Sequence, residues 1–337
     1  MRLREEMKEV KRCKKCLTLN TRPGIVFTED GICSACINAE RKKMIDWKER
    51  EKDLQKLFNS FKSQKNKDGY NCIVPVSGGK DSYFQVWKVK ELGMNPLCIT
   101  WACCYPTEEG KKNLENLIRS LDVGHIKITP KPSDYRKKMK EGLIEEGDCC
   151  FPCHIGIFER VVELAEKLGI SLVIWGEKAR EEYGGDGGSA VDIPLLLDGI
   201  MNVYLSDYVF WNAGEQVKIA EKLGFRRLKY APSGAYLDYE NVDCAKIVSW
   251  HDYFMWLKFG FGRACTQLSI DVRNERMTRD IALEKLKEYE PAKRPSNVKE
   301  FIDFIGITEE ELEEAERKWS NKEIIEQVIW ELKGKEV

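Results

Sequence analysis

The sequence lacks the features that place a protein in a membrane or on nucleic acid. No apolar run approaches the roughly 18 residues that a membrane-spanning helix needs, and the charged start, MRLREEMKEVKRCKKC, has no apolar segment of a secretory signal. With 55 basic and 56 acidic side chains the net charge is −1, so no overall positive field attracts DNA or RNA. We therefore expect a globular cytoplasmic protein, with no membrane partner and no nucleic acid as its expected ligand.

Histidine is scarce, with three residues, whereas cysteine is abundant, with 13. In a reducing compartment, cysteine pairs are more often metal ligands or reactive thiols than disulfides. Cys13 and Cys16 form one Cys-x-x-Cys pair, Cys33 and Cys36 form another, and the sixteen residues between the pairs are typical of a hairpin. Two such pairs bring four thiolates to one tetrahedral ion. The sequence therefore predicts a closed, structural zinc site.

The chain divides by composition into four parts. We expect a four-cysteine zinc module at 1–45, a linker helix at 46–70, a nucleotide-binding domain at 71–235 and a mainly helical, substrate-binding region at 236–337. Expected strands are 71–76, 95–103, 125–130, 171–176 and, in FRRLKYAP, 225–232. Expected helices are 40–63, 81–92, 107–121, 154–168 and 213–223. Strands that alternate with helices through short connections predict an α/β fold with a doubly wound parallel sheet.

The loop after the first expected strand, Ser77-Gly-Gly-Lys-Asp-Ser82, has the elements of a phosphate site. It is not a Walker A loop, because Val74 and Asp81 stand where that loop has Gly and Ser or Thr. Glycines let the backbone approach an anion closely, and the following helix points free N–H groups at it. Asp81 can cap the helix or hold Mg²⁺. The stretch predicts a phosphate or pyrophosphate cradle at the carboxyl end of the strand.

The segment GDCCFPCHIGIFERV (147–161) places Cys149, Cys150, Cys153 and His154 before or at the start of a helix, where the helix dipole stabilises a thiolate. Three interpretations stay open. The segment is a second metal or Fe–S site, an element that holds a nucleophile or positions substrate, or a buried helix entrance with inert thiols.

In VIWGEKAREEYGGDGG, a strand is followed by Glu177, Glu181 and Glu182. Carboxylates at a strand's carboxyl end bind Mg²⁺, ammonia or substrate hydroxyls, and the glycines at 184–188 provide a loop able to close over substrate. Glu177 stands nearest to the strand end. The alternative is a solvated helix start.

The segment 249–284 combines aromatic residues with basic ones and glycines. The set is Lys258, Gly260, Gly262, Arg263, Arg273, Asn274, Arg276 and Arg279. Arginines in such density suit an anionic group such as a diphosphate or a uronate. The alternative is a solvated charged face.

SGGKDS after an apolar strand resembles the SGGxDS signature of the PP-loop ATP pyrophosphatase superfamily. With the two Cys-x-x-Cys pairs, PCHIGI followed by IWGE…EYGG, and KFGFGRA…IDVRN.RMTR, the chain is similar over roughly 10–290 to N-acetyl sugar amidotransferases of lipopolysaccharide and related surface-sugar pathways. The resemblance implies a Rossmann-like fold of the HUP type. It also implies that ATP activates the acetamido oxygen of a nucleotide-linked sugar by adenylation, and that ammonia displaces AMP to give an acetamidino group.

The resemblance further implies roles for single residues and cofactors. Catalysis falls to Lys80, Asp81 and Glu177. ATP is bound by Val76, Ser77, Gly78, Gly79, Lys80, Asp81, Ser82, Thr100 and Gly176. Substrate is bound by Cys153, His154, Lys258, Arg263, Arg273, Asn274 and Arg276. The cofactors are ATP, Mg²⁺ and a structural Zn²⁺. No cysteine follows Met1 and no G-x-C-x-G elbow is present. The resemblance implies that a separate glutaminase subunit supplies the ammonia.

The main alternative is a PP-loop tRNA thiolase with an Fe–S cluster. Cys150 and Cys153, with Cys103, Cys244 or Cys265 as a third ligand, would hold the cluster. The balanced net charge and the absence of a basic stripe argue against it. A third alternative, a scaffold without catalysis, is opposed by the intact SGGKDS.

Overall fold

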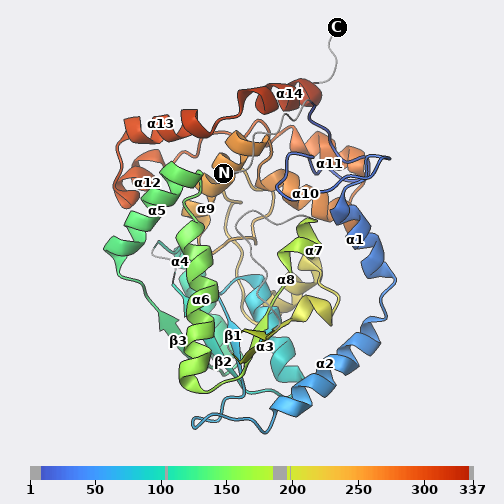
Figure 1. Ribbon diagram of the computed structural model, residues 1–337, viewed down its shortest axis with the longest axis vertical. Coiled ribbons are helices and arrows are strands. Elements are labelled where there is room, and N and C mark those ends of the chain that lie inside the picture. Colours follow the sequence, from blue (N-terminus) through green and yellow to red (C-terminus); the bar gives the residue numbers. More distant parts are fainter. Residues whose placement is uncertain (1–8, 103–104, 185–195, 198, 334–337) are drawn as a thin grey trace.

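The computed structural model describes residues 9–102, 105–184, 196–197 and 199–333 (Figure 1). Its strands are β1 (Cys72–Pro75), β2 (Pro96–Trp101), β3 (Gly124–Ile128), β4 (Leu172–Trp175), β5 (Leu196–Leu197) and β6 (Ile200–Tyr204). They form one sheet in the order β3-β2-β1-β4-β6-β5, in which all pairs are parallel except β5 with β6. The strand order reverses direction between β1 and β4, which confirms the doubly wound α/β fold.

The described helices divide between the sheet, the cysteine module and the carboxyl-terminal region. The first eight are α1 (Ser34–Lys43), α2 (Trp47–Phe61), α3 (Lys80–Glu91), α4 (Glu108–Ser120), α5 (Pro132–Glu146), α6 (Phe151–Leu168), α7 (Ala179–Tyr183) and α8 (Ala213–Lys222). The last six are α9 (Ala245–Phe259), α10 (Arg263–Arg273), α11 (Arg279–Leu286), α12 (Val298–Ile305), α13 (Glu309–Trp319) and α14 (Lys322–Lys333). No helix within these residues is both long and apolar enough to cross a membrane.

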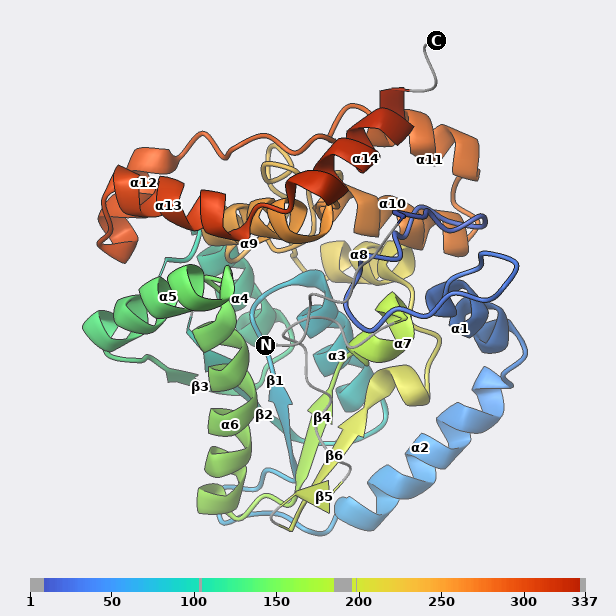
Figure 2. The same cartoon turned by 45° about the horizontal axis from the view of Figure 1, so that its top comes forward.

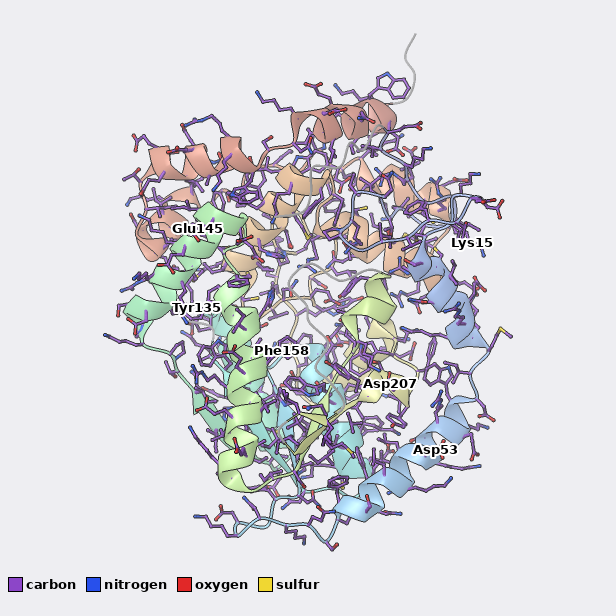
Figure 3. The ribbon with its side chains drawn as sticks, viewed as in Figure 1. Lys15, Asp53, Tyr135, Glu145, Phe158 and Asp207 are labelled. Atoms are coloured by element: carbon purple, nitrogen blue, oxygen red, sulfur yellow. The ribbon has the colours of Figure 1, made fainter. Side chains whose placement is uncertain are left out.

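Helices cover both faces of the sheet, because successive strand residues point to opposite sides. Val74 of β1 packs in a core with residues of α2, α3, α4 and α8. Its neighbour Ile73 packs in a second core with Val161 of α6. On that second face Phe158 of α6 (Figure 3) lies against Trp175 of β4, with ring centroids 5.2 Å apart. Burial on both faces explains why the central strands are continuously apolar.

The helices α9 to α14 lie across the end of the sheet to which the strands point (Figure 2). Their own core contains the fully buried Trp250 of α9, whose ring stacks on Phe301 of α12 at 4.4 Å. The cysteine module packs against this region. Arg12 forms an ion pair with Glu331 of α14 at 2.8 Å. The carboxyl ends of the strands are therefore enclosed by parts of the chain that precede and follow the sheet domain.

Two sequence expectations are wrong in detail. Residues 225–232 are irregular, with Leu228 donating to the Asp238 carbonyl, and the fifth parallel strand is the apolar Ile200–Tyr204 instead. The expected helix 40–63 is two helices, because the Asp46 side chain accepts the amides of Lys48 and Glu49 and starts α2 anew. The sequence reading also missed α5.

Candidate functional site

The loop between β1 and α3 is fixed in its conformation by hydrogen bonds from its backbone amides to its own serine hydroxyls. The Ser77 amide donates to Ser82 Oγ at 3.0 Å, and the Gly79 amide donates to Ser77 Oγ at 3.3 Å. Gly78 has φ +88°, and a Cβ there would lie 2.7 Å from the Leu114 amide nitrogen. A side chain at 78 would therefore fill the space between the loop and α4. Such a loop, opening onto a helix N-terminus, fits the phosphates of ATP.

The other residues predicted to bind ATP lie at the strand ends from which the loop begins. Thr100 at the end of β2 donates its hydroxyl to the Val76 carbonyl at 2.7 Å, and the Val76 amide donates to Ile99 at 2.8 Å. Gly176 follows β4, where a Cβ would lie 3.1 Å from the Trp211 ring. These contacts set the ends of three neighbouring strands beside the loop.

Lys80 is the buried cation of the site. Its ammonium contacts Asp81 Oδ2 at 2.7 Å and Glu240 Oε1 at 2.8 Å, so it joins the loop to the segment before α9. The other oxygen of Asp81, Oδ1, is buried and accepts no hydrogen bond. A buried carboxylate oxygen without a partner is unfavourable unless a donor or cation reaches it. The donor set therefore fits Mg²⁺, which prefers carboxylate and phosphate oxygens.

Glu177 follows Gly176 and accepts a hydrogen bond from the Tyr183 hydroxyl at 3.1 Å. Burial raises the pKa of Glu177 to about 8, helped by the negative charges of Asp81 and Glu182. The carboxyl is thus poised to gain or lose a proton near neutral pH. Glu182 pairs with Lys42 of the cysteine module at 2.9 Å. The structure brings the three predicted catalytic residues, Lys80, Asp81 and Glu177, into one charged cluster.

Two arginines lie on the basic side of the cluster. Arg263 was predicted to bind substrate, whereas Arg22 was missed in the sequence analysis. Arg263 at the start of α10 binds both oxygens of Asp252, at 2.8 to 3.1 Å. Arg22, from the hairpin of the cysteine module, lies 4.4 Å from the Phe261 ring and 5.7 Å from the Tyr183 ring. It donates to the Thr266 hydroxyl at 2.5 Å.

Arg22 is a cation without a carboxylate partner among the described residues. Burial, together with the positive charges of Arg273 and Arg263, lowers the pKa of Arg22 to about 10. An anion of the substrate would relieve both effects. Nothing in the local sequence, TRPG, distinguishes this arginine from a surface residue, so it becomes evident only once the module is packed against α7 and α10.

The other predicted substrate residues have partners within the protein. Arg273 donates to Cys16 Sγ at 3.7 Å and to the Glu182 carbonyl at 3.0 Å. Arg276 pairs with Asp271 at 2.6 Å. The remaining two act at helix ends: the Asn274 side chain donates to the Ile270 carbonyl at 2.9 Å, and Lys258 to the Glu146 carbonyl at 3.0 Å. These bonds hold the cysteine module and helix ends in place around the cluster.

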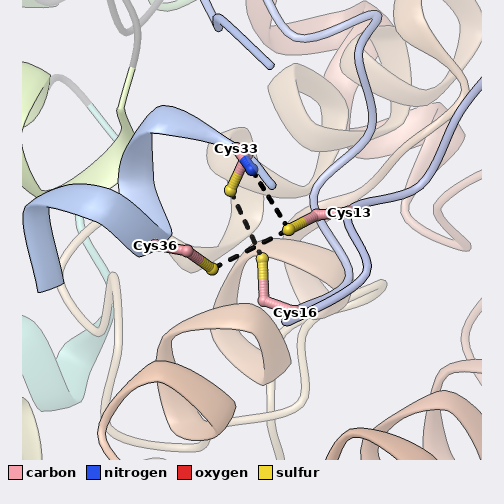
Figure 4. Close-up of side chains that lie close together, drawn as sticks. All are labelled: Cys13, Cys16, Cys33 and Cys36. Atoms are coloured by element: carbon pink, nitrogen blue, oxygen red, sulfur yellow. Dashed lines mark hydrogen bonds between the residues drawn. The ribbon is translucent and has the colours of Figure 1, made fainter. Parts of the chain in front are cut away.

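The four cysteines of the module converge as the sequence predicts (Figure 4). Their sulfur atoms all lie within 4.8 Å of one another, with Cys13 to Cys36 at 3.8 Å and Cys16 to Cys33 at 3.6 Å. Four Zn–S bonds of about 2.3 Å place tetrahedral sulfurs about 3.8 Å apart. The thiols are buried, and the set fits a structural Zn²⁺.

The segment with Cys150, Cys153 and His154 forms the start of α6. Asp148 Oδ1 accepts hydrogen bonds from His251 Nδ1 and from the Cys150 amide, both at 2.8 Å. The His154 and His251 rings lie 6.0 Å apart, edge to face. Burial and the charge of His251 lower the pKa of His154 to about 4, so its ring is neutral. The sequence reading missed Asp148 and His251, which are about a hundred residues apart in the chain.

Comparison with known proteins finds similarities over most of the chain and a family match in the carboxyl-terminal region. A protein of Methanocaldococcus jannaschii described as uncharacterized is 24% identical over 298 residues, which are 88% of this chain and 99% of that protein. The structure of NMN synthetase from Francisella tularensis is 16% identical and covers 75% of this chain and 99% of its own, with a TM-score of 0.42. A U34-tRNA thiolase from Methanococcus maripaludis, with its 4Fe-4S cluster, is 14% identical over 79% of this chain and 86% of its own, with a TM-score of 0.35. Residues 229–334 match the family "LPS biosynthesis protein WbpG-like, C-terminal domain", so the region that contains α9 to α14 is similar to a WbpG-like C-terminal domain.

Proposed function

We propose that this protein is an ATP-dependent amidotransferase that converts the acetamido group of a nucleotide-linked sugar into an acetamidino group. The observation that carries the proposal is the position of the charged cluster. A phosphate-binding loop and Glu177 meet Glu240 and Arg263 of the WbpG-like C-terminal region. Surface-polysaccharide sugars are the substrate class that the name of this domain family points to.

The proposed reaction has two steps. The acetamido oxygen bonds to the α-phosphorus of ATP, and pyrophosphate leaves. Ammonia then adds to the activated carbon and loses a proton, and AMP leaves with the former amide oxygen. An amide oxygen is a poor leaving group, and adenylation makes it a good one.

Each group of the cluster has a role in this reaction. The amides in the first turn of α3 and the Lys80 ammonium bind phosphate oxygens. Asp81, with Glu240, would hold Mg²⁺, which supplies charge neutralisation at the phosphates. Glu177, with its pKa of about 8, accepts the proton that ammonia releases. The enclosed site keeps water from hydrolysing the adenylate.

We propose that two arginines bind the anionic group of the sugar substrate. Arg263 is hydrogen-bonded to Asp252, and Arg22 lies between aromatic rings, one of which is Tyr183. Both arginines suit the diphosphate or a uronate carboxylate of the sugar. Ammonia is proposed to come from a separate glutaminase subunit. Free ammonium at high concentration is expected to replace that subunit in an assay.

The test uses the purified full chain with ATP, Mg²⁺, ammonium and a panel of UDP-acetamido sugars, including diacetamido uronates. We expect AMP with one sugar only, a product in which NH replaces the acetamido oxygen, and, from substrate labelled with ¹⁸O at that position, label in AMP. An Asp81→Asn variant controls for contaminating ATPases. ATP that no sugar consumes, but that tRNA and a sulfur donor convert to AMP, would refute the proposal in favour of a thiolase.

A further inference from the structure

We propose that Asp148, Cys150 and His251 form a second metal site, separate from the four-cysteine site, that binds a divalent transition-metal ion such as Zn²⁺. One oxygen, one sulfur and one ring nitrogen from these residues all lie within 4.8 Å of one another. Within the described residues, this cluster and the four cysteines are the two groups with such geometry.

The fold positions the three residues firmly. Asp148 and Cys150 lie in the tight turn between α5 and α6, and His251 lies on α9 of the C-terminal region. Gly147 ends α5 with φ +61°, and the Asp148 amide donates to the Gly142 carbonyl at 3.0 Å. Asp148 and Cys150 are buried, at 8% and 9% exposure. Ligands fixed by a buried turn lose little entropy when an ion binds.

The ligand types select the kind of ion. Zn²⁺ accepts thiolate, imidazole and carboxylate, whereas Mg²⁺ and Ca²⁺ prefer oxygen alone. His251 Nδ1 and Asp148 Oδ1 are hydrogen-bonded at 2.8 Å. Two ligands at about 2.1 Å from a tetrahedral ion are about 3.4 Å apart. Small side-chain rotations therefore suffice to replace this hydrogen bond by two metal bonds.

The chemistry of the two sites should differ. Four thiolates close the coordination shell of the first ion. Three protein ligands leave a position for water or for a substrate oxygen, as in Lewis-acid sites. The cluster also lies near the candidate active site, because His251 is followed in α9 by Asp252, which accepts hydrogen bonds from Arg263 at 2.8 to 3.1 Å. A substrate held by Arg263 would be near the open position.

Metal content of the full chain tests the site. The wild type, loaded with Zn²⁺ or Co²⁺ and desalted, should hold two ions per chain by elemental analysis. His251→Gln and Cys150→Ala should each hold one, and the Co²⁺ form should lose part of its thiolate charge-transfer absorption. His125→Asn, which alters the histidine on β3, is the matched control and should hold two.

A titration of the wild type with Co²⁺ keeps the test decisive if a variant does not fold. Two binding phases with different visible spectra support the site, because four thiolates and a mixed set produce different ligand fields. A single phase that saturates at one ion overturns it. So does retention of both ions in folded His251→Gln, or iron with inorganic sulfide in place of a mononuclear ion.

Discussion

Glu177 shows how neighbours determine the chemistry of one side chain. Its carboxyl follows a strand end, beside Asp81 and Glu182, and its pKa is about 8 rather than the usual 4.5. Such a group is an effective base near neutral pH. The same shift ties the stability of the fold to pH, because the unfolded chain releases this proton at lower pH than the folded chain does.

The sign of that linkage gives the first prediction. Below pH 4.5 both states of wild type carry the proton, and its contribution to stability is complete. As the pH rises from 4.5 to about 8, only the unfolded state loses it, so the unfolding free energy falls. We expect Glu177→Gln to gain a few degrees in Tm over wild type between pH 5 and 8, without ligands. Glu166→Gln, at an exposed site on α6, is the control and should show the same dependence of Tm on pH as wild type. The same dependence of Tm on pH in all three proteins would contradict the raised pKa of Glu177.

Gly78 is the second residue whose surroundings determine its role. Ala at this position is strained by the positive φ and meets the Leu114 backbone at 2.7 Å. We expect Gly78→Ala to lose roughly 2 to 4 kcal/mol of stability and to weaken ATP binding at least tenfold in calorimetry. Gly69→Ala is the matched control, because Gly69 has φ +90° with nothing within 4 Å. It should cost about 1 kcal/mol and bind ATP normally. Equal losses of ATP affinity in both variants would exclude the steric explanation.

At the scale of elements, the sequence predicted those whose signals are local. β1, β2 and β4 are short apolar runs, and the capping box that starts α13 can be seen in the sequence Thr308-Glu-Glu-Glu311. The sequence-based prediction failed for segments whose secondary structure depends on tertiary contacts. Ile200–Tyr204 pairs in parallel with β4, a distant partner that its own residues do not indicate. Basic residues at 225–232 do not extend the sheet, since Arg227 instead pairs with Glu221 and Asp238.

The cysteine module contributes more than a metal site if its hairpin supplies Arg22 to the substrate. We expect Arg22→Gln to raise the KM for the sugar about 10- to 100-fold, the loss of one charge-assisted hydrogen bond, with little change in the KM for ATP. Arg41→Gln, at an exposed position on α1, is the control and should leave both constants unchanged. A drop in kcat with both KM values unaltered would argue that Arg22 does not bind the sugar.

At the scale of the whole molecule, the candidate site is assembled from three parts of the chain. The loop after β1 supplies Lys80 and Asp81, the end of β4 supplies Glu177, and the C-terminal region supplies Glu240 and Arg263. The sequence could predict the residues within contiguous motifs. Glu240 had no motif around it, and its role follows from an ion pair with Lys80 that bridges 160 positions of the chain. An ion pair between residues so far apart in the sequence forms only after the C-terminal region has packed against the sheet domain.

The same packing predicts that the four-cysteine site stabilises distant helices. Arg279 donates to the carbonyls of Cys13 and Cys16 at 3.2 Å, and Arg12 pairs with Glu331. Removing a ligand by Cys33→Ser frees the ion and unfolds the module, so α11 and α14 lose these partners.

We expect Cys33→Ser to lower Tm by roughly 5 to 10 °C. Amide hydrogen exchange should accelerate in α11 and α14, while β1 and β2 stay protected. Cys98→Ala, in the sheet core, is the control: it should retain the metal and the protection of α14, since it leaves only a small cavity. Unchanged exchange in α14 after the metal is lost would mean that the C-terminal helices hold together without the module. In that case the contacts of Arg12 and Arg279 would contribute little to the stability of the C-terminal helices.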